Sequence, residues 1–152
     1  MLCLPTSLCS WNFRIHGAAF DNAAVTFEFG SDQGGILLGE AEFAICRHDA
    51  AKDQWTLERE GRVLAEVKKV SHRVCTYEIA AGENRFVVRG QSPHTRCFDI
   101  VAGDKVVGTI VPVHMLTRRT KVECREAVPE HLQLFAFWLG ALNWRRNADE
   151  NS

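Results

Sequence analysis

Basic side chains in three short stretches are the residues of this sequence best suited to bind a ligand. The stretches contain Lys68, Lys69 and Arg73; Arg118, Arg119 and Lys121; and Arg145 with Arg146. Arg and Lys supply positive charge and hydrogen-bond donors, which phosphate oxygens accept. The alternative is an ordinary solvated exterior, because glutamates neighbour the cations in the sequence. These are Glu58, Glu66, Glu123 and Glu126. From the first two stretches we predict six lipid-headgroup-binding residues, Lys68, Lys69, Arg73, Arg118, Arg119 and Lys121.

Cys46 and His48 stand two residues apart, as on one face of a strand, where a thiolate and an imidazole could share a metal ion. The sequence lacks a second Cys/His pair at zinc spacing, so we predict no metal site. A Cys–His nucleophile requires contact in space that a sequence does not reveal. The chain also lacks the G-x-S-x-G, phosphate-loop and dinucleotide-loop motifs. We therefore predict no catalytic residue and no cofactor, and keep a Cys/His enzyme as an alternative.

The composition limits the class of protein. The chain has 152 residues, 46% of them hydrophobic and 24% charged, with a formal net charge of −1. This is enough for one domain with a sizeable core, and the charge balance argues against nucleic acid as the partner. No apolar run reaches the roughly 18 residues of a membrane-spanning helix. The six cysteines form no C-x-x-C pair, so we expect free thiols. Without a secretory leader, a cytoplasmic location is the expectation.

Alternation of apolar and polar residues predicts about ten strands with turns rich in Gly, Asp and Asn between them. Residues 36–48 read as one long strand, and 55–67 align without gaps to 98–110 as two similar hairpins. Residues 29–41 follow the same outline. Gly39, Ala65 and Gly108 take equivalent inward positions in these three hairpins. Small residues there indicate close approach by a bulky element, although ordinary turn-proximal residues are the alternative.

One segment, 130–146, predicts a helix. Residues 134–142 are uninterruptedly apolar, so the helix is apolar around its whole circumference and must be enclosed. Its apolar part, 132–144, is about 20 Å long, which suits a buried helix better than a bilayer span. Enclosing a helix requires a barrel of about 11 strands. We therefore predict a mainly β fold, a closed antiparallel barrel of about 10–12 strands wrapped around a central C-terminal helix. Residues 1–10 are expected to be a disordered lead-in, 11–146 the domain and 147–152 a tail.

The hairpins 55–67 and 98–110, the strand 75–79 and the helix 132–144 together resemble the Tubby C-terminal-like superfamily, in particular its LURP-one-related and scramblase-like branch. The resemblance covers residues 11–146 and implies twelve strands around the helix. Tubby-like members bind phosphoinositide headgroups through basic surface residues, and scramblase-like members are linked to lipid movement and Ca²⁺. The acidic Ca²⁺-binding segment of the latter has no counterpart in residues 145–150.

The expected function is a cytoplasmic, non-enzymatic binding or scaffold module, peripheral at a membrane, whose partner is an anionic phospholipid surface or another protein. A carrier of a small apolar ligand is an alternative. It requires a hollow barrel with the helix packed outside.

Overall fold

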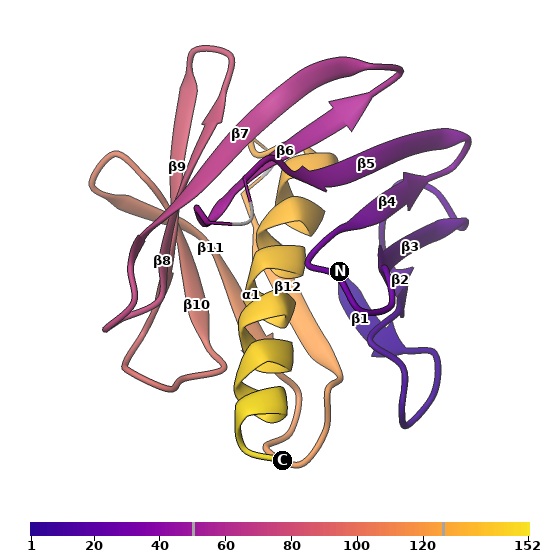
Figure 1. The fold of residues 1–152 in the computed structure, drawn as a ribbon. Coiled ribbons are helices and arrows are strands. Elements are labelled where there is room, and N and C mark those ends of the chain that lie inside the picture. The colour runs from indigo at the N-terminus through magenta and orange to yellow at the C-terminus, as the bar shows by residue number, and fades with distance from the viewer. Residues whose placement is uncertain (50, 126) are drawn as a thin grey trace.

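In the computed structural model the chain forms a β-barrel around one long helix (Figure 1). The structure describes residues 1–49, 51–125 and 127–152. Within these residues it has twelve strands and one helix. They are β1 (Leu2–Pro5), β2 (Phe13–His16), β3 (Ala23–Phe27), β4 (Gly34–Leu38), β5 (Ala41–Arg47), β6 (Gln54–Arg59), β7 (Arg62–Ser71), β8 (Thr76–Ala81), β9 (Asn84–Gly90), β10 (Phe98–Ala102), β11 (Lys105–Pro112), β12 (Thr120–Cys124) and α1 (Glu130–Glu150). The predicted fold class is confirmed.

Strand β1 closes the barrel. Each strand pairs antiparallel with the next one in the chain, and β1 pairs with both β2 and β12. Leu2 lies opposite Lys121 and Cys3 lies opposite Thr120. The expectation of a disordered lead-in over 1–10 is therefore wrong for residues 2–5. Four residues ending in a proline are too short to show the alternation that reveals a strand in a sequence.

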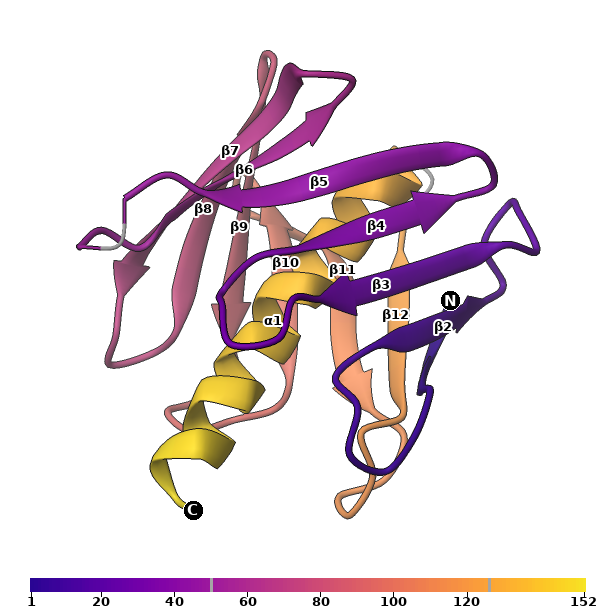
Figure 2. The ribbon, with the colours of Figure 1, turned by 45° about the vertical axis from the view of Figure 1, so that its right-hand side comes forward.

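Helix α1 runs through the barrel from end to end (Figure 2). Every residue from Leu132 to Trp144 is buried. The barrel surrounds the helix on all sides, which is why its apolar residues are not confined to one stripe. The prediction of a central helix is confirmed, and the hollow barrel of the ligand-carrier alternative is wrong. The helix continues to Glu150, so residues 147–150 are helical and not part of a tail.

The two aligned hairpins have the same register. Trp55 lies opposite Val67 and Leu57 opposite Ala65 in one; Phe98 lies opposite Ile110 and Ile100 opposite Gly108 in the other. A register shift follows at the same place in both hairpins. The repeat seen in the sequence is thus a structural repeat of β6–β7 and β10–β11.

The third hairpin differs from its prediction. Residues 36–48 form two strands, β4 and β5, because the chain turns at Gly39, whose φ is +63°. Gly39 therefore occupies a turn and leaves no clearance for the helix. The close approach occurs instead at Gly34, where an added Cβ would lie 2.0 Å from the Thr26 carbonyl oxygen and 2.7 Å from Trp138 Nε1. A glycine is required there because the Thr26 carbonyl of the neighbouring strand and Trp138 of the helix together fill the space that a side chain would occupy.

Antiparallel order gives the barrel two unlike ends. The turn end, where α1 begins, has the two-residue connections 39–40, 60–61, 82–83 and 103–104. The loop end, where α1 emerges, has the connections 6–12, 28–33, 72–75, 91–97 and 113–119 and the segment after β5. The C-terminus lies at this end in Figure 1. Longer connections on a rigid scaffold are where binding residues concentrate, so the loop end is the place to look for a site.

Candidate functional site

The six cations predicted from the sequence lie on two opposite walls of the barrel. Strands β8–β11 separate β7 from β12 on one side, and β1–β6 separate them on the other. The first wall carries Lys68 and Lys69 on β7, with Arg73 in the loop that follows; the second carries Arg118 and Arg119 just before β12, with Lys121 on it. The structure does not bring the six together as one patch. Both groups nevertheless lie toward the loop end.

Two of the lysines are paired with carboxylates. Lys68 Nζ lies 3.9 Å from Glu78 Oε2, and Lys121 Nζ lies 2.8 Å from Glu123 Oε1. Lys69 lies over the Tyr77 ring, 5.8 Å from its centroid. The sequence indicated Glu123 correctly as a residue that dilutes positive charge, while Glu126 lies outside the described residues. Lys68 and Lys121 therefore offer little uncompensated charge, whereas the neutral Tyr77 ring does not cancel the charge of Lys69.

Arg118 differs from the lysines because its partners are neutral. Its guanidinium donates hydrogen bonds to the carbonyl oxygens of Ser7, Leu8 and Ser10, and it stacks on Trp11, 5.1 Å from the ring centroid. These contacts join the 6–12 and 113–119 loops. Carbonyls fix the guanidinium in place without cancelling its charge.

Arg96 is a second arginine of this kind, and the sequence did not single it out because no other cation neighbours it. Arg96 Nη1 donates to the Met115 carbonyl at 2.9 Å, and Nη2 donates to the Thr117 carbonyl. The guanidinium lies over the Trp144 indole, 5.1 Å from the ring centroid. Each of the two arginines thus stacks on a tryptophan and connects the 113–119 loop to a neighbouring loop. This similarity between Arg96 and Arg118 is visible only in the folded structure.

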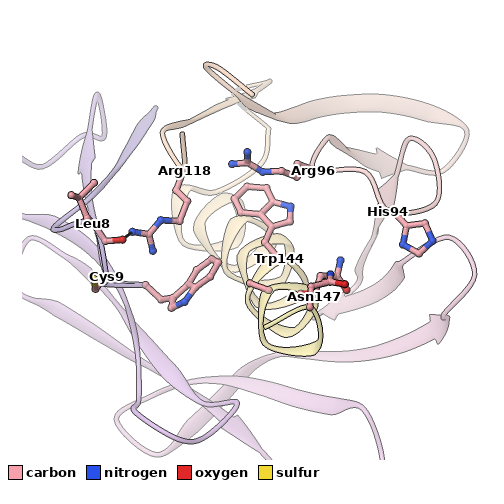
Figure 3. A pocket seen from close by; sticks show the side chains of 10 residues that line it. Leu8, Cys9, His94, Arg96, Arg118, Trp144 and Asn147 are labelled. Carbon is pink, nitrogen blue, oxygen red and sulfur yellow. Dashed lines mark hydrogen bonds between the residues drawn. The ribbon is translucent and has the colours of Figure 1, made fainter. Parts of the chain in front are cut away.

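Arg96 and Arg118 face a common pocket of about 560 Å³ beside the end of α1 (Figure 3). Its lining also includes Trp11, Trp144 and Asn147. Burial is the largest cause and lowers the pKa of Arg96; the charge of Cys97 opposes it, and the positive charge of Arg118 adds the smallest lowering. Among the described residues, neither arginine has a carboxylate within salt-bridge distance. Two positive charges are therefore held close to one another without a neutralising partner.

Large apolar side chains project from the same loops. Leu8 is 96% exposed, Met115 87% and Leu116 92%. Leu8 and the 113–119 loop are joined through Arg118, so these three side chains, which we call the apolar tips, belong to neighbouring loops. Phe29 in the 28–33 loop is also fully exposed at this end. Exposed apolar groups rimmed by polar residues indicate a contact surface.

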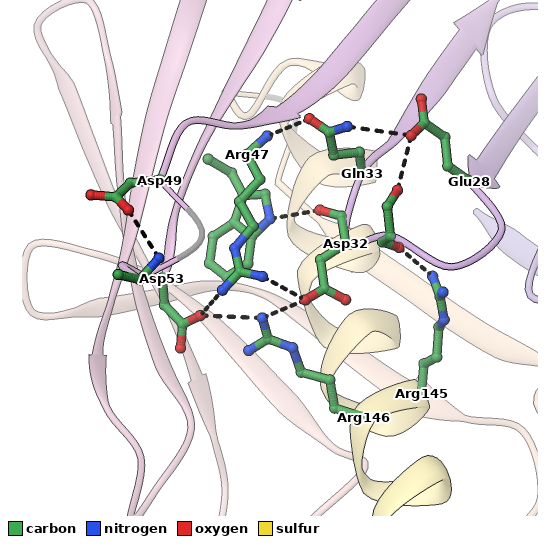
Figure 4. Close-up of polar contacts among 11 residues, drawn as sticks. Glu28, Asp32, Gln33, Arg47, Asp49, Asp53, Arg145 and Arg146 are labelled. Carbon is green, nitrogen blue, oxygen red and sulfur yellow. Dashed lines mark hydrogen bonds and ion pairs between the residues drawn. The ribbon is translucent and has the colours of Figure 1, made fainter.

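The cations on α1 have a structural role instead. Arg146 Nη2 lies 2.8 Å from Asp32 Oδ2 and 3.1 Å from Asp53 Oδ1, and Arg47 reaches the same two oxygens at 3.0 and 3.1 Å (Figure 4). Arg145 donates to the Ser31 carbonyl. This four-residue ion network fastens the emerging helix to the 28–33 loop, to the end of β5 and to Asp53, the residue just before β6. Because its charges balance, it is unsuited to hold an anion.

The ion network predicts a pH dependence of stability. Burial alone would raise the pKa of Asp53, but the hydrogen bond and charge of Arg146, with Lys69 and Arg47, outweigh it and lower that pKa. A lowered carboxyl pKa in the folded state stabilises the protein above the unfolded value of about 3.9, and the contribution is lost as pH falls through the folded pKa. We expect Asp53→Asn to lower the free energy of unfolding by about 1 kcal/mol near neutral pH.

Urea unfolding at about pH 7 and about pH 3 checks this expectation. The difference between wild type and Asp53→Asn should shrink at the acid pH, because the carboxyl of the unfolded chain is then largely protonated and the stabilisation decreases as the pH approaches the lowered folded-state pKa. Asp104→Asn in an exposed turn is the control and should leave stability unchanged at both values. An equal deficit of the Asp53 variant at both pH values would contradict the electrostatic explanation.

Cys46 and His48 both contact the side chain of Glu58. His48 Nε2 lies 2.6 Å from Thr56 Oγ1, which donates to Glu58 Oε2 at 2.6 Å. Across residues 1–49, 51–125 and 127–152, no three His, Cys, Asp or Glu side chains are arranged to hold a metal ion. Burial, with the hydrogen bond and charge of Glu58, raises the pKa of Cys46, which disfavours the thiolate that a nucleophile needs. This cluster therefore gives no support to the Cys/His enzyme alternative.

Comparison with known proteins gives no relatives: no family model, curated protein or solved structure matches this chain. In the part of the chain that the structure describes, no helix has both the length and the apolar character needed to span a bilayer.

Proposed function

We propose that this protein is a peripheral membrane-binding module of the Tubby C-terminal-like kind, which docks on anionic lipid with the loop end of its barrel. The observation that carries the proposal is the combination of Leu8, Met115 and Leu116, almost fully exposed, with Arg96 and Arg118, which bind backbone carbonyls and form no ion pair with any described carboxylate. Apolar side chains that enter the interface and cations that meet the headgroups are the two components of peripheral membrane binding. The closed barrel around a C-terminal helix supports the family proposal.

The geometry of the loop end supports a specific orientation. Arg118 and Arg96 hold the 6–12, 91–97 and 113–119 loops to one another through backbone carbonyls, so the apolar tips are displayed by a braced surface. Insertion then requires little further ordering, which reduces the entropic cost of binding. Arg119, exposed beside Arg118, adds a cation at the same rim. The four ion-paired residues near the end of α1 keep the helix fixed while the loops make contact.

Co-sedimentation with vesicles tests the proposal. We expect the wild-type chain to bind vesicles of four parts phosphatidylcholine to one part phosphatidylserine, and to bind pure phosphatidylcholine more weakly. Replacing both Met115 and Leu116 with serine should weaken binding at least about tenfold, because burying one such side chain contributes about 1.5–3 kcal/mol. Val106→Ser, an exposed apolar position near the turn end, is the matched control and should bind as wild type.

Two results would overturn the proposal. One is the absence of binding to anionic vesicles even at low salt, where the attraction between cations and headgroups is strongest. The other is an equal loss for Val106→Ser and for the Met115/Leu116 variant, which would show that binding does not depend on the loop end.

A further inference from the structure

The pocket lined by Arg96 and Arg118 has features that a general attraction to an anionic membrane does not require. We infer that it is a binding site for a phosphate monoester, built from the two arginines, the Trp144 indole and Asn147. The inference rests on the proposed function only for the source of the phosphate, which is either a lipid headgroup or a small soluble molecule.

The first observation is the pair of arginines. Both guanidinium groups are anchored by carbonyl oxygens, and each still has N–H groups beyond those used in these bonds, since a guanidinium has five. Two like charges held near one another without a carboxylate are unfavourable in the empty pocket. A ligand carrying nearly two negative charges, as a phosphate monoester does at neutral pH, relieves that repulsion.

The second observation is independent and concerns Trp144. Its side chain lines the pocket and the residue is only 5% exposed. The indole Nε1–H is buried and has no acceptor among the described residues. Trp55 and Trp138, by contrast, donate their indole N–H groups to the carbonyls of Asp32 and Thr26. A buried donor without an acceptor is costly and uncommon in folded proteins. Because Nε1 is itself buried, a phosphate oxygen would satisfy it only if the indole shifts toward the pocket on binding.

The remaining lining agrees with an acceptor-rich ligand. Asn147 and Asn151 contribute amides, and His94 contributes an imidazole, as Figure 3 shows for the residues that it labels. No Asp or Glu lines the pocket among the described residues. The faces of Trp11 and Trp144 are covered by the two guanidinium groups. The pocket thus offers donors and positive charge from several directions.

Titration with inorganic phosphate and with glycerol 1-phosphate tests the site without any membrane. In a ¹H–¹⁵N spectrum the four tryptophans give four indole signals, and Trp144→Phe assigns the one that matters. We expect the Trp144 signal to shift on addition of glycerol 1-phosphate, while the signals of Trp55 and Trp138 stay in place. Sulfate-free chloride buffer at equal ionic strength is the control for general salt effects.

Asn147→Asp is the decisive variant, because it places a resident carboxylate in the same pocket without changing the size of the side chain. We expect it to weaken glycerol 1-phosphate binding at least about tenfold and to leave the melting temperature equal to or above that of wild type. Arg62→Gln, an exposed arginine at the turn end, should bind as wild type. No movement of the Trp144 signal, or unchanged binding by Asn147→Asp, would overturn the inference.

Vesicles distinguish the two sources of phosphate and separate this inference from the proposed function. If the phosphate is a lipid headgroup, wild type should prefer phosphatidic acid to phosphatidylserine at equal vesicle charge, and Asn147→Asp should lose that preference. Binding of glycerol 1-phosphate without vesicle binding supports the pocket for a soluble ligand and overturns the membrane function. Vesicle binding that Asn147→Asp leaves unchanged, with no effect of glycerol 1-phosphate, supports the membrane function and overturns the pocket.

Discussion

Trp138→Ala is expected to lower the free energy of unfolding by about 4 kcal/mol, enough to leave much of the protein unfolded. Trp138 is fully buried at the centre of α1. Its ring stacks on Phe27 with centroids 4.9 Å apart and meets Trp55 edge-on at 6.4 Å. Its Nε1 donates to the Thr26 carbonyl at 3.2 Å. Alanine would leave a cavity between the helix and two strands. It would also leave the Thr26 carbonyl oxygen without the Nε1–H donor of Trp138.

Urea unfolding followed by circular dichroism measures this loss, provided that the variant is folded in the absence of denaturant. Should it be unfolded, Trp138→Phe is the second variant: it keeps most of the volume and should lose only about 1–3 kcal/mol. Wild-type stability for Trp138→Ala would contradict the conclusion that the helix is the core of the barrel.

Gly34→Ala is expected to destabilise the protein by about 3 kcal/mol, although it adds only one methyl group. An alanine Cβ would lie 2.0 Å from the Thr26 carbonyl oxygen and 2.7 Å from Trp138 Nε1. Neither neighbour can yield easily, because one is backbone in a paired strand and the other is the donor of the hydrogen bond between helix and barrel. The strand and the helix must therefore separate, with loss of packing on both.

Gly140→Ala provides the matched control for that variant. Gly140 lies in the same helix, and an added Cβ would meet the Phe98 ring at 3.4 Å, an ordinary contact. Alanine favours the helix over glycine by roughly 1 kcal/mol, so this variant should be as stable as wild type or more so. Comparing the two melting temperatures separates a general intolerance of added methyl groups from the specific close approach at Gly34.

The architecture could be predicted because two patterns in the sequence have few physical solutions. Nine consecutive apolar residues within a helix require enclosure, and strands at regular spacing supply the barrel. The bounds of the buried segment, Leu132 to Trp144, agree with the prediction. The errors came from short features. β1 was too short to show a pattern, and Gly39 fell in the turn that divides β4 from β5.

The candidate site was predicted only in part, because clustering in sequence is a poor guide to clustering in space. Lys121 is paired with Glu123, which the sequence made visible, whereas Lys68 is paired with Glu78, which lies opposite it on the neighbouring strand and far from it in the sequence. Arg118 was predicted for its neighbours Arg119 and Lys121, but its partner in the pocket is Arg96, a lone cation from another loop. The exposure of the apolar tips could not be predicted, because the sequence of a loop does not show whether an apolar residue in it is buried or exposed.

A barrel built around a helix that follows all twelve strands in the chain has consequences for how the protein is made. The ribosome releases the strands first, and their inward faces lack their contacts with the helix until α1 is complete. The apolar side chains on the inward faces of the strands therefore stay partly exposed until the helix forms. Phe13, Ile15 and Trp55 are examples. Partly made chains expose this surface and are targets for chaperones and for aggregation. Translation speed over the region that encodes α1 should then affect yield more than the same change over the early strands.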